Sequence, residues 1–406
     1  MFLDPNIVLA GEVTGPAHVT SDELRSVFEV MSDGDVLVCY QHARRQRDWR
    51  GDKRRAFTRA LGVNSREVKV FESKLARNHR ALLSDKKEII GTLHVEAWRQ
   101  PMNAPPHQGG PPPWIAPEMQ QQIEWRDRDI LISVPMKSGT TWTMNIVHQL
   151  ITGGDPDFAD IYAEVPWIEI LTRPEMPIQE LLNRLGQMSL ERPRAFKTHA
   201  APPVLPYIEP GGDKNVRYIV VFRNPEEALV SAKPFLEQHT DEWYELWKTP
   251  KGALLRPGFP AFYHEVIDAM GMHAALFGFL QSWWPLRNRS NVLFLHFSNM
   301  KQDHQGSIRR IADFIGSRPT NEQFQAITEY TSFPWMKQNG IKFDASTATD
   351  VPLLRPGTMV RRGEVGGARE DGMTRAISEH LCAIGSQICT DHRALRWFYE
   401  GGPLPH

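Results

Sequence analysis

The stretch DILISVPMKSGTTWTMNIVHQL, residues 129–150, decides the fold of this chain. Its first seven residues are mostly apolar and typical of a buried strand, and the residues from Thr140 to Leu150 follow helical spacing. A loop that joins a strand to the start of a helix points backbone N–H groups and the positive end of the helix dipole at a bound anion. Gly139 lets an anion approach closely, and Lys137 adds a positive charge. The stretch therefore predicts an anion-binding loop between a strand and a helix.

Outward from this loop, apolar runs alternate with helical segments, as in βαβ units around a largely parallel sheet. The predicted strands are Asp129–Pro135, Arg194–Lys197, Val216–Phe222 and Asn291–Phe297. The predicted helices are Thr140–Leu150, Pro225–Gln238 and Gly306–Gly316. We therefore predict an α/β fold with a central, largely parallel sheet flanked by helices. In such sheets, ligands bind beyond the carboxyl ends of the strands.

A segment dense in proline and glycine, residues 101–117, predicts an extended linker. The 406 residues then divide into an N-terminal α/β extension of unknown role (1–100), the linker, and a main domain (118–406). In the extension we predict helices at Ser21–Met31 and Lys69–Leu83 and strands at Asp35–Tyr40 and Glu88–Trp98.

The formal net charge of −1 leaves no global field for nucleic acid or for an acidic membrane surface. The basic run His42–Arg55 is interpreted as a solvated face, although an accessory nucleic-acid contact stays open. No stretch reaches the roughly 18 apolar residues that a membrane span needs, and no leader is evident, so we expect a cytoplasmic protein. The cysteines, Cys39, Cys382 and Cys389, fit neither a disulfide framework nor a zinc site.

Two further segments concentrate positive charge beside possible anion sites. Arg223 follows the strand Val216–Phe222, and Ser231 lies eight residues later on the next helix, so a guanidinium and a hydroxyl could meet one phosphate. By itself, an Arg-Asn-Pro sequence also fits an ordinary turn. Near the C-terminus, Arg361, Arg362 and Gly363 could close over a phosphate, or form a mobile surface loop.

The string K-S-G-T-T-W, Lys137–Trp142, resembles the 5′-phosphosulfate loop of the cytosolic sulfotransferase family, with the family's preceding proline replaced by Met136. A nucleotide-triphosphate P-loop instead places lysine after its last glycine. The resemblance implies a P-loop-like sulfotransferase fold and an enzyme. Its donor would be 3′-phosphoadenosine 5′-phosphosulfate (PAPS), the product 3′-phosphoadenosine 5′-phosphate (PAP), and no metal would be needed.

Other segments in the same order resemble the rest of the family's nucleotide site, including T-S-F at Thr331–Phe333 and R-R-G-x-x-G at Arg361–Gly366; Phe297 stands where the family has tyrosine. The resemblance implies that the cofactor-binding residues are Lys137, Ser138, Gly139, Thr140, Thr141, Trp142, Arg223, Ser231, Phe297, Thr331, Ser332, Phe333, Met359, Arg361, Arg362 and Gly363.

Lys197-Thr198-His199, at the end of a short predicted strand, is similar to the family's K-T-H catalytic segment. The resemblance implies that His199 is the general base and that Lys137 and Lys197 neutralise growing charge. A histidine with an ordinary pKa near 6.5 suits proton removal near neutral pH. Small-molecule pockets are mainly apolar, so we expect the acceptor to contact Tyr162, Pro166, Trp167, Phe235, Phe262 and Tyr263. Trp283 and Trp284 are assigned to the core.

The chain also departs from the family. Ala368 replaces the tryptophan that usually follows the last glycines, and the family's dimer motif is not recognisable in Arg369–Glu379, so monomer and homodimer both stay open. The partner we expect is a small-molecule acceptor, of which neither the identity nor the attacking atom, oxygen or nitrogen, is determined. The alternatives are a nucleotide kinase and a module that binds PAP without turnover.

Overall fold

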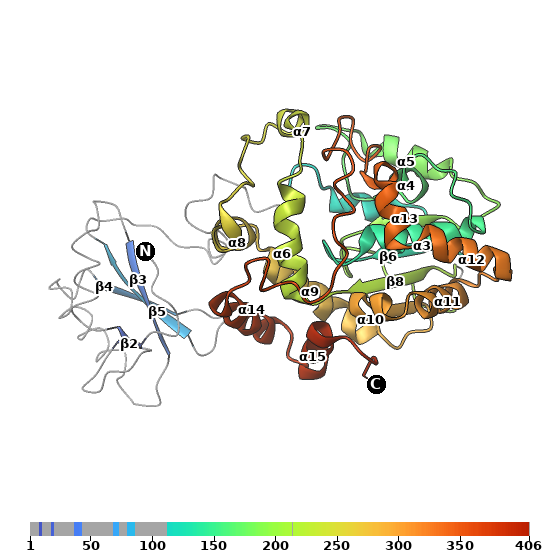
Figure 1. The fold of residues 1–406 in the computed structure, drawn as a ribbon. Helices are drawn as coiled ribbons and strands as arrows, with labels where there is room; N and C mark the ends of the chain where they lie inside the picture. Colours follow the sequence, from blue (N-terminus) through green and yellow to red (C-terminus); the bar gives the residue numbers. More distant parts are fainter. Residues whose placement is uncertain are drawn as a thin grey trace. The chain divides into compact units, whose positions relative to one another are not determined.

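The computed structural model describes residues 8–9, 18–19, 36–42, 68–72, 79–85, 112–212 and 214–405. The chain divides into two compact units, Met1–Trp98 and Arg99–His406. The functional residues predicted from the sequence all lie in the second unit (Figure 1).

The second unit is built on a parallel sheet of four strands, β6 (Ile130–Ser133), β7 (Ala195–Thr198), β8 (Arg217–Phe222) and β9 (Val292–His296). Their order in the sheet is β7-β6-β8-β9, and the register pairs Ile132 with Lys197 on one side and with Ile219 on the other. The strands are almost entirely buried, as expected for a parallel sheet covered by helices. All four predicted strands are therefore confirmed.

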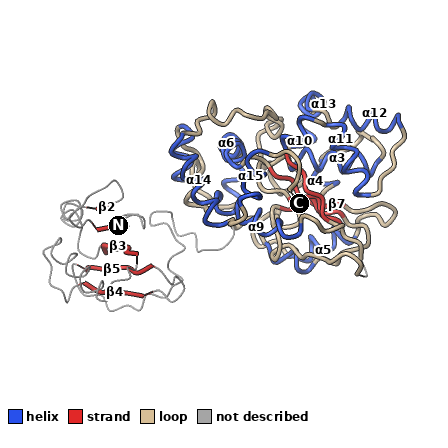
Figure 2. The backbone as a smooth tube through the Cα atoms, turned by 90° about the horizontal axis from the view of Figure 1, so that it is seen from below, coloured by secondary structure: helices blue, strands red, loops and turns tan. Residues whose placement is uncertain are grey.

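Helices surround this sheet (Figure 2). They are α3 (Thr140–Thr152), α4 (Ile161–Glu164), α5 (Ile178–Gly186), α6 (Pro225–Leu236), α7 (Asp241–Leu246), α8 (Gly258–Phe262), α9 (Met272–Trp283), α10 (Phe297–Gln302), α11 (His304–Ile315), α12 (Asn321–Tyr330), α13 (Phe333–Gln338), α14 (Arg375–Ile388) and α15 (His392–Glu400). The three helices predicted from the sequence correspond to α3, α6 and α11.

Local sequence signals explain where the functional helix α6 begins. The Asn224 side chain caps it by accepting hydrogen bonds from the N–H groups of Glu226 and Glu227, and Pro225 occupies the first turn, where a missing N–H costs nothing. The helix therefore starts directly after strand β8. This start holds Arg223 at the carboxyl end of the strand and sends the following residues along the sheet.

The core of the second unit is rich in aromatic side chains. Phe222 contacts the rings of Phe279 and Trp397 at centroid distances of 5.6 and 5.4 Å. Trp283 and Trp284 are buried, with exposed fractions of 0% and 5%, which confirms their assignment to the core. None of the helices in the described part of the chain has the length and apolar character needed to span a bilayer.

The end of the predicted linker belongs to the second unit. Ile115 pairs with Ile170 as an isolated bridge, and the Ala116 N–H donates to the carbonyl of Glu169 at 2.8 Å. The Trp114 ring lies 4.7 Å from that of Trp243. Residues 112–117 therefore pack on the domain that follows them.

The first unit is described only in its strands. These are β1 (Val8–Leu9), β2 (His18–Val19), β3 (Val36–His42), β4 (Val68–Glu72) and β5 (His79–Asp85). Strand β5 pairs antiparallel with β3 and with β4. The predicted strand at Asp35–Tyr40 corresponds to β3.

The predicted helix at Lys69–Leu83 is wrong, because this segment contributes β4 and most of β5. Pairing with partners distant in the sequence overrides the local helical pattern, since short apolar runs fit both states. The predictions for Ser21–Met31 and Glu88–Trp98, and nearly all of the basic run, lie outside the described residues.

Candidate active site

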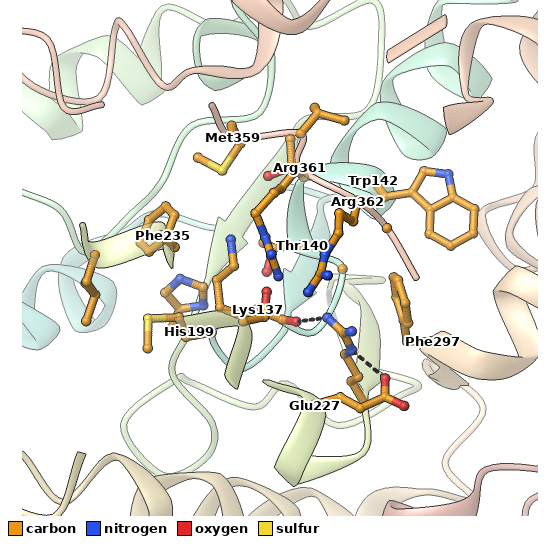
Figure 3. A pocket seen from close by; sticks show the side chains of 18 of the residues that line it. Lys137, Thr140, Trp142, His199, Glu227, Phe235, Phe297, Met359, Arg361 and Arg362 are labelled. Carbon is orange, nitrogen blue, oxygen red and sulfur yellow. Dashed lines mark hydrogen bonds and ion pairs between the residues drawn. The ribbon is translucent and has the colours of Figure 1, made fainter. Parts of the chain in front are cut away.

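A cavity of about 560 Å³ gathers the predicted nucleotide and catalytic residues. Figure 3 shows the side chains of Lys137, His199, Arg361 and Arg362 around one space, with Phe297 and Trp142 to one side. Of the predicted residues, those that line the cavity are Lys137, Gly139, Thr140, Thr141, Trp142, Tyr162, Trp167, Lys197, His199, Arg223, Ser231, Phe235, Phe297, Ser332, Phe333, Met359, Arg361, Arg362 and Gly363.

The loop between β6 and α3 has the geometry of an anion cradle. Lys137 and Gly139 both adopt left-handed backbone conformations, with φ of 61° and 96°. Gly139 caps α3 without any side-chain hydrogen bond to the first-turn N–H groups. The hydroxyls of Ser138 and Thr140 are buried and have no partner among the described residues. Unpaired buried donors are costly, so the Thr140 hydroxyl, which lines the cavity, fits a phosphate or sulfonate oxygen.

The Lys137 ammonium is destabilised in its charged form. Burial, followed by the nearby charges of Arg223 and Arg361, lowers the pKa of Lys137 to about 7. Its Nζ lies 4.1 Å from the centre of the Phe235 ring. A bound dianion would reverse this shift by favouring the charged ammonium.

Arg223 is held in place from several sides. Its Nε donates to a carboxylate oxygen of Glu227 at 3.0 Å, and its terminal nitrogens donate to the carbonyls of Lys137 at 3.2 Å and Glu364 at 2.9 Å. The guanidinium lies 4.6 Å from the centre of the Phe297 ring. The Glu227 carboxylate also accepts from the Gly366 N–H at 2.7 Å. Arg223 and Glu227 therefore tie the C-terminal loop to the phosphate loop.

The C-terminal loop brings two more arginines to the cavity. Arg361 and Arg362 both pair with Asp371, the first at 3.8 Å and the second in direct contact. Gly363 has φ 62°, and a Cβ at this position would lie 2.8 Å from the Phe333 ring. Only glycine therefore allows the loop to pass this close to α13.

Aromatic side chains form part of the cavity wall. The Trp142 and Phe297 rings meet edge to face at 5.7 Å, and the Trp142 indole donates to the carbonyl of Thr331 at 2.9 Å. Thr331 and Ser138 are fully buried and do not line the cavity. Thr331 is thus placed behind the wall, where its carbonyl orients Trp142.

His199 has the tautomer that a general base needs. Its Nδ1 lies 2.5 Å from the carbonyl oxygen of Val134, and because a carbonyl only accepts, Nδ1 must carry the hydrogen. The lone pair is therefore on Nε2. Burial, followed by the charge of Lys197, holds the pKa of His199 well below its ordinary value, so the imidazole is neutral at pH 7.

Lys197 lies beside this histidine at the end of β7. Its Nζ is 2.9 Å from the centre of the Trp167 ring. Burial lowers the pKa of Lys197, and the charge of Glu169 opposes that shift. Glu169 is itself buried and accepts the His199 backbone N–H at 2.6 Å. Glu169, which the sequence prediction missed, therefore binds the backbone of His199 and acts on Lys197 through its charge.

Three predicted acceptor residues are wrong, because they do not line the cavity. Phe262 and Tyr263 do not line the cavity; both are fully buried, and the Tyr263 hydroxyl contacts His380 at 3.3 Å. An aromatic residue in sequence does not reveal whether it faces a ligand or the core, and the core is the commoner place. Pro166 is also buried and does not line the cavity.

The structure adds cavity residues that the prediction missed, among them Trp114, His239, Trp243, Met270, Met272, Lys301 and His304. The residue spacing along α6 could have predicted that His239 lines the cavity. Glu227, Ser231 and Phe235 recur every four residues on one face of α6 and line the cavity, and His239 continues that spacing just beyond the helix.

Comparisons with known proteins identify the family to which the chain belongs. The sulfotransferase domain model matches residues 127–389. The chain is 28% identical over 285 residues to sulfotransferase 1A1 of Mus musculus, covering 67% of this chain and 88% of that protein. It is 28% identical over 218 residues to sulfotransferase 1E1 of the same species, covering 53% and 68%.

Solved structures share the fold. A mouse sulfotransferase, SULT7A1, complexed with PAP has a TM-score of 0.52 at 21% identity and covers 70% of this chain and 91% of its own. A retinol dehydratase in complex with androsterone and PAP also scores 0.52, at 19% identity, covering 73% and 90%. With the family model matching most of the chain, this protein belongs to the cytosolic-type sulfotransferase family and is a sulfotransferase.

Proposed function

We propose that this enzyme transfers the sulfonate group of PAPS to a hydroxyl or amine of a small-molecule acceptor by in-line attack, with His199 as general base and PAP as product. One observation carries the proposal: Lys137, Arg223 and Arg361 line the same cavity as His199. The PAP complexes of the structural neighbours support the same nucleotide here.

The nucleotide roles follow from the position of each group. The first N–H groups of α3, the unpaired hydroxyl of Thr140 and the Lys137 ammonium would hold the 5′-phosphosulfate. Arg223, Ser231 and the loop from Arg361 to Gly363 would hold the 3′-phosphate. When bound, PAPS supplies an already activated sulfonate, so no metal is needed.

The chemical roles fall to three side chains. Nε2 of His199 takes the proton from the attacking hydroxyl or amine, since Nδ1 is occupied by the carbonyl of Val134. Lys137 and Lys197 stabilise the negative charge that grows on the transferring and leaving oxygens. Tyr162, Trp167 and Phe235 form part of the acceptor wall.

The first prediction concerns His199. His199→Ala should lower turnover by about 10²- to 10⁴-fold, which is the usual contribution of a general base, while PAP affinity stays close to normal. Transfer of labelled sulfonate from PAPS to a panel of phenols, alcohols and amines measures the turnover, and calorimetry with PAP measures the affinity.

The matched control is His148→Ala. His148 is another buried histidine, with a pKa lowered to about 4 mainly by burial, and it does not line the cavity. This variant should keep turnover near the wild-type rate. Near-normal transfer by His199→Ala would contradict the assigned base, and the absence of any PAP affinity in the wild type would contradict the whole proposal.

The two alternatives make different predictions. A nucleotide kinase would transfer phosphate from ATP with Mg²⁺, and a binding module would hold PAP without sulfonating any acceptor. For a sulfotransferase we expect no phosphate transfer from ATP, and we expect sulfonation of at least one acceptor. We also expect EDTA to leave the sulfonate transfer intact. We also propose a cytoplasmic location, on the strength of the cytosolic-type relatives.

A further inference from the structure

His239 places a hydrogen-bond acceptor atom in the cavity. The inference about what this atom binds rests on the proposed function. Its Nδ1 lies 3.0 Å from the carbonyl oxygen of Leu236, and because a carbonyl only accepts, Nδ1 carries the hydrogen. Nε2 is left with a lone pair, and it makes no hydrogen bond within the described residues. His239 lines the cavity.

The surroundings of His239 are aromatic. Its ring lies 4.3 Å from that of Trp243 and 5.5 Å from that of Phe235, and Trp114 packs on the same Trp243 at 4.7 Å. Burial lowers the pKa of His239 to about 4, the hydrogen bond to Leu236 opposes that shift, and the charge of Lys137 adds to it. The ring is therefore neutral at pH 7 and can only accept at Nε2.

Phe235 connects this histidine to the reacting end of the cavity. The same ring contacts both the Lys137 ammonium, at 4.1 Å, and the His239 ring, at 5.5 Å. A planar acceptor lying against Phe235 would thus have one end beside the catalytic groups and the other near His239. An apolar wall that ends in a single hydrogen-bond acceptor atom discriminates strongly between substrates. A substrate with a hydrogen-bond donor at that place is paired, whereas a substrate with a hydrogen-bond acceptor there is left unpaired.

We propose that His239 is a specificity-determining residue that selects two-ended acceptors. Such an acceptor is uncharged and has an apolar body, a hydroxyl at the end that is sulfonated, and a second hydrogen-bond donor at the far end that bonds to Nε2 of His239. A substrate with a carboxylate or carbonyl at the far end finds no N–H on Nε2 of His239, so its binding is disfavoured.

The test compares two matched series of acceptors with PAPS as donor. The first is 4-(hydroxymethyl)phenol and its hydroxyethyl and hydroxypropyl homologues; the second is 4-ethyl-, 4-propyl- and 4-butylphenol. The measured quantity is the ratio of kcat/KM for the best hydroxylated member to that of its alkyl partner, in the wild type, His239→Phe and His239→Gln.

His239→Phe keeps an aromatic ring against Trp243 but removes the acceptor atom, so we expect this ratio to fall about 3- to 10-fold, the usual worth of one neutral hydrogen bond. The loss should lie in KM of the hydroxylated phenol, with kcat unchanged, because the contact is the same before and during transfer. His239→Gln offers an amide oxygen instead and should keep most of the preference.

Other results would overturn the inference in distinguishable ways. An equal ratio in the wild type and His239→Phe, or a loss of activity on both series in proportion, would show that His239 only packs, while the sulfotransferase function stands. If the wild type sulfonates no acceptor, both the proposed function and this inference are wrong.

Discussion

At the scale of single residues, the two groups with displaced pKa values predict the pH dependence of catalysis. Lys137, with a pKa of about 7, is charged below that pH and neutral above it. His199, with a pKa well below 6.5, keeps its basic form when the pH falls to 6. We therefore expect kcat/KM for PAPS, which reports the free enzyme, to decline as pH rises past about 7 and to show no acidic decline near 6.5.

The lysine part of this prediction can be isolated with Lys137→Arg. Arginine stays charged throughout the accessible pH range, so the alkaline decline should disappear, even if the absolute rate is lower. An alkaline decline that is unchanged in this variant would assign the titration to another group.

Gly139 is a second residue with a clear expectation. It has φ 96°, and a Cβ at this position would lie 2.8 Å from Cδ2 of Phe297. Gly139→Ala should destabilise the fold by about 1–2 kcal/mol from the left-handed backbone alone and should weaken PAP binding, measured by thermal unfolding and calorimetry. Gly278→Ala is the control, because nothing lies within 4 Å of its added Cβ and alanine favours its helix; it should not be destabilising.

Asp371 occupies the two loop arginines that we propose for the nucleotide. Its carboxylate pairs with both Arg361 and Arg362, which are the groups proposed to bind the 3′-phosphate. Asp371→Asn should tighten PAP binding by up to about fivefold, given the small energies of partly exposed pairs. Glu370→Gln makes the same change in net charge one residue away and should have a smaller effect. Weaker PAP binding in Asp371→Asn would mean that the carboxylate positions the arginines instead.

At the scale of elements, a buried ion pair joins the starts of two neighbouring strands of the sheet. Arg194, before β7, donates to Asp129, before β6, at 2.9 and 2.5 Å, and both side chains are almost fully buried. Asp129→Ala should destabilise the fold by about 3–5 kcal/mol, because it leaves an uncompensated buried charge. The exposed pair of Arg375 and Glu379 provides the control, and Glu379→Ala should barely move the unfolding midpoint.

Helix α6 shows how one element organises the site. Glu227, Ser231 and Phe235 stand four residues apart and line the cavity. The same face thus carries the carboxylate that holds Arg223, a hydroxyl proposed for the 3′-phosphate, and an aromatic ring against Lys137. A single helix that follows β8 therefore links the end of the cavity proposed for the nucleotide to the end proposed for the acceptor.

At the scale of the whole molecule, the described residues that line the cavity all belong to the second unit. We therefore predict that a chain starting at Arg99 keeps kcat and KM for PAPS within about twofold of the full chain, since every described group assigned to donor binding or proton transfer stays in place. Steady-state kinetics and the oligomer mass in solution test this. A changed acceptor KM would indicate that residues 1–98 cap the site, and a changed mass would indicate a role in assembly.

The sequence by itself determined the parallel strands, the anion loop and the positions of the basic residues. Their signals are local: Lys137–Trp142 follows a buried run, Arg223 follows another, and parallel strands bring their carboxyl ends to one edge of the sheet. The order of these segments along the chain was enough to predict that they meet.

Only the tertiary structure decided which apolar side chains face the acceptor. It buried Phe262 and Tyr263 in the core, brought Trp114 from the predicted linker to the cavity, and placed His239 and Glu169 beside groups distant in the sequence. It also replaced the helix predicted at Lys69–Leu83 with paired strands. The physical reason is common to these cases: burial and strand pairing depend on neighbours distant along the chain, and no local pattern records which neighbours those are.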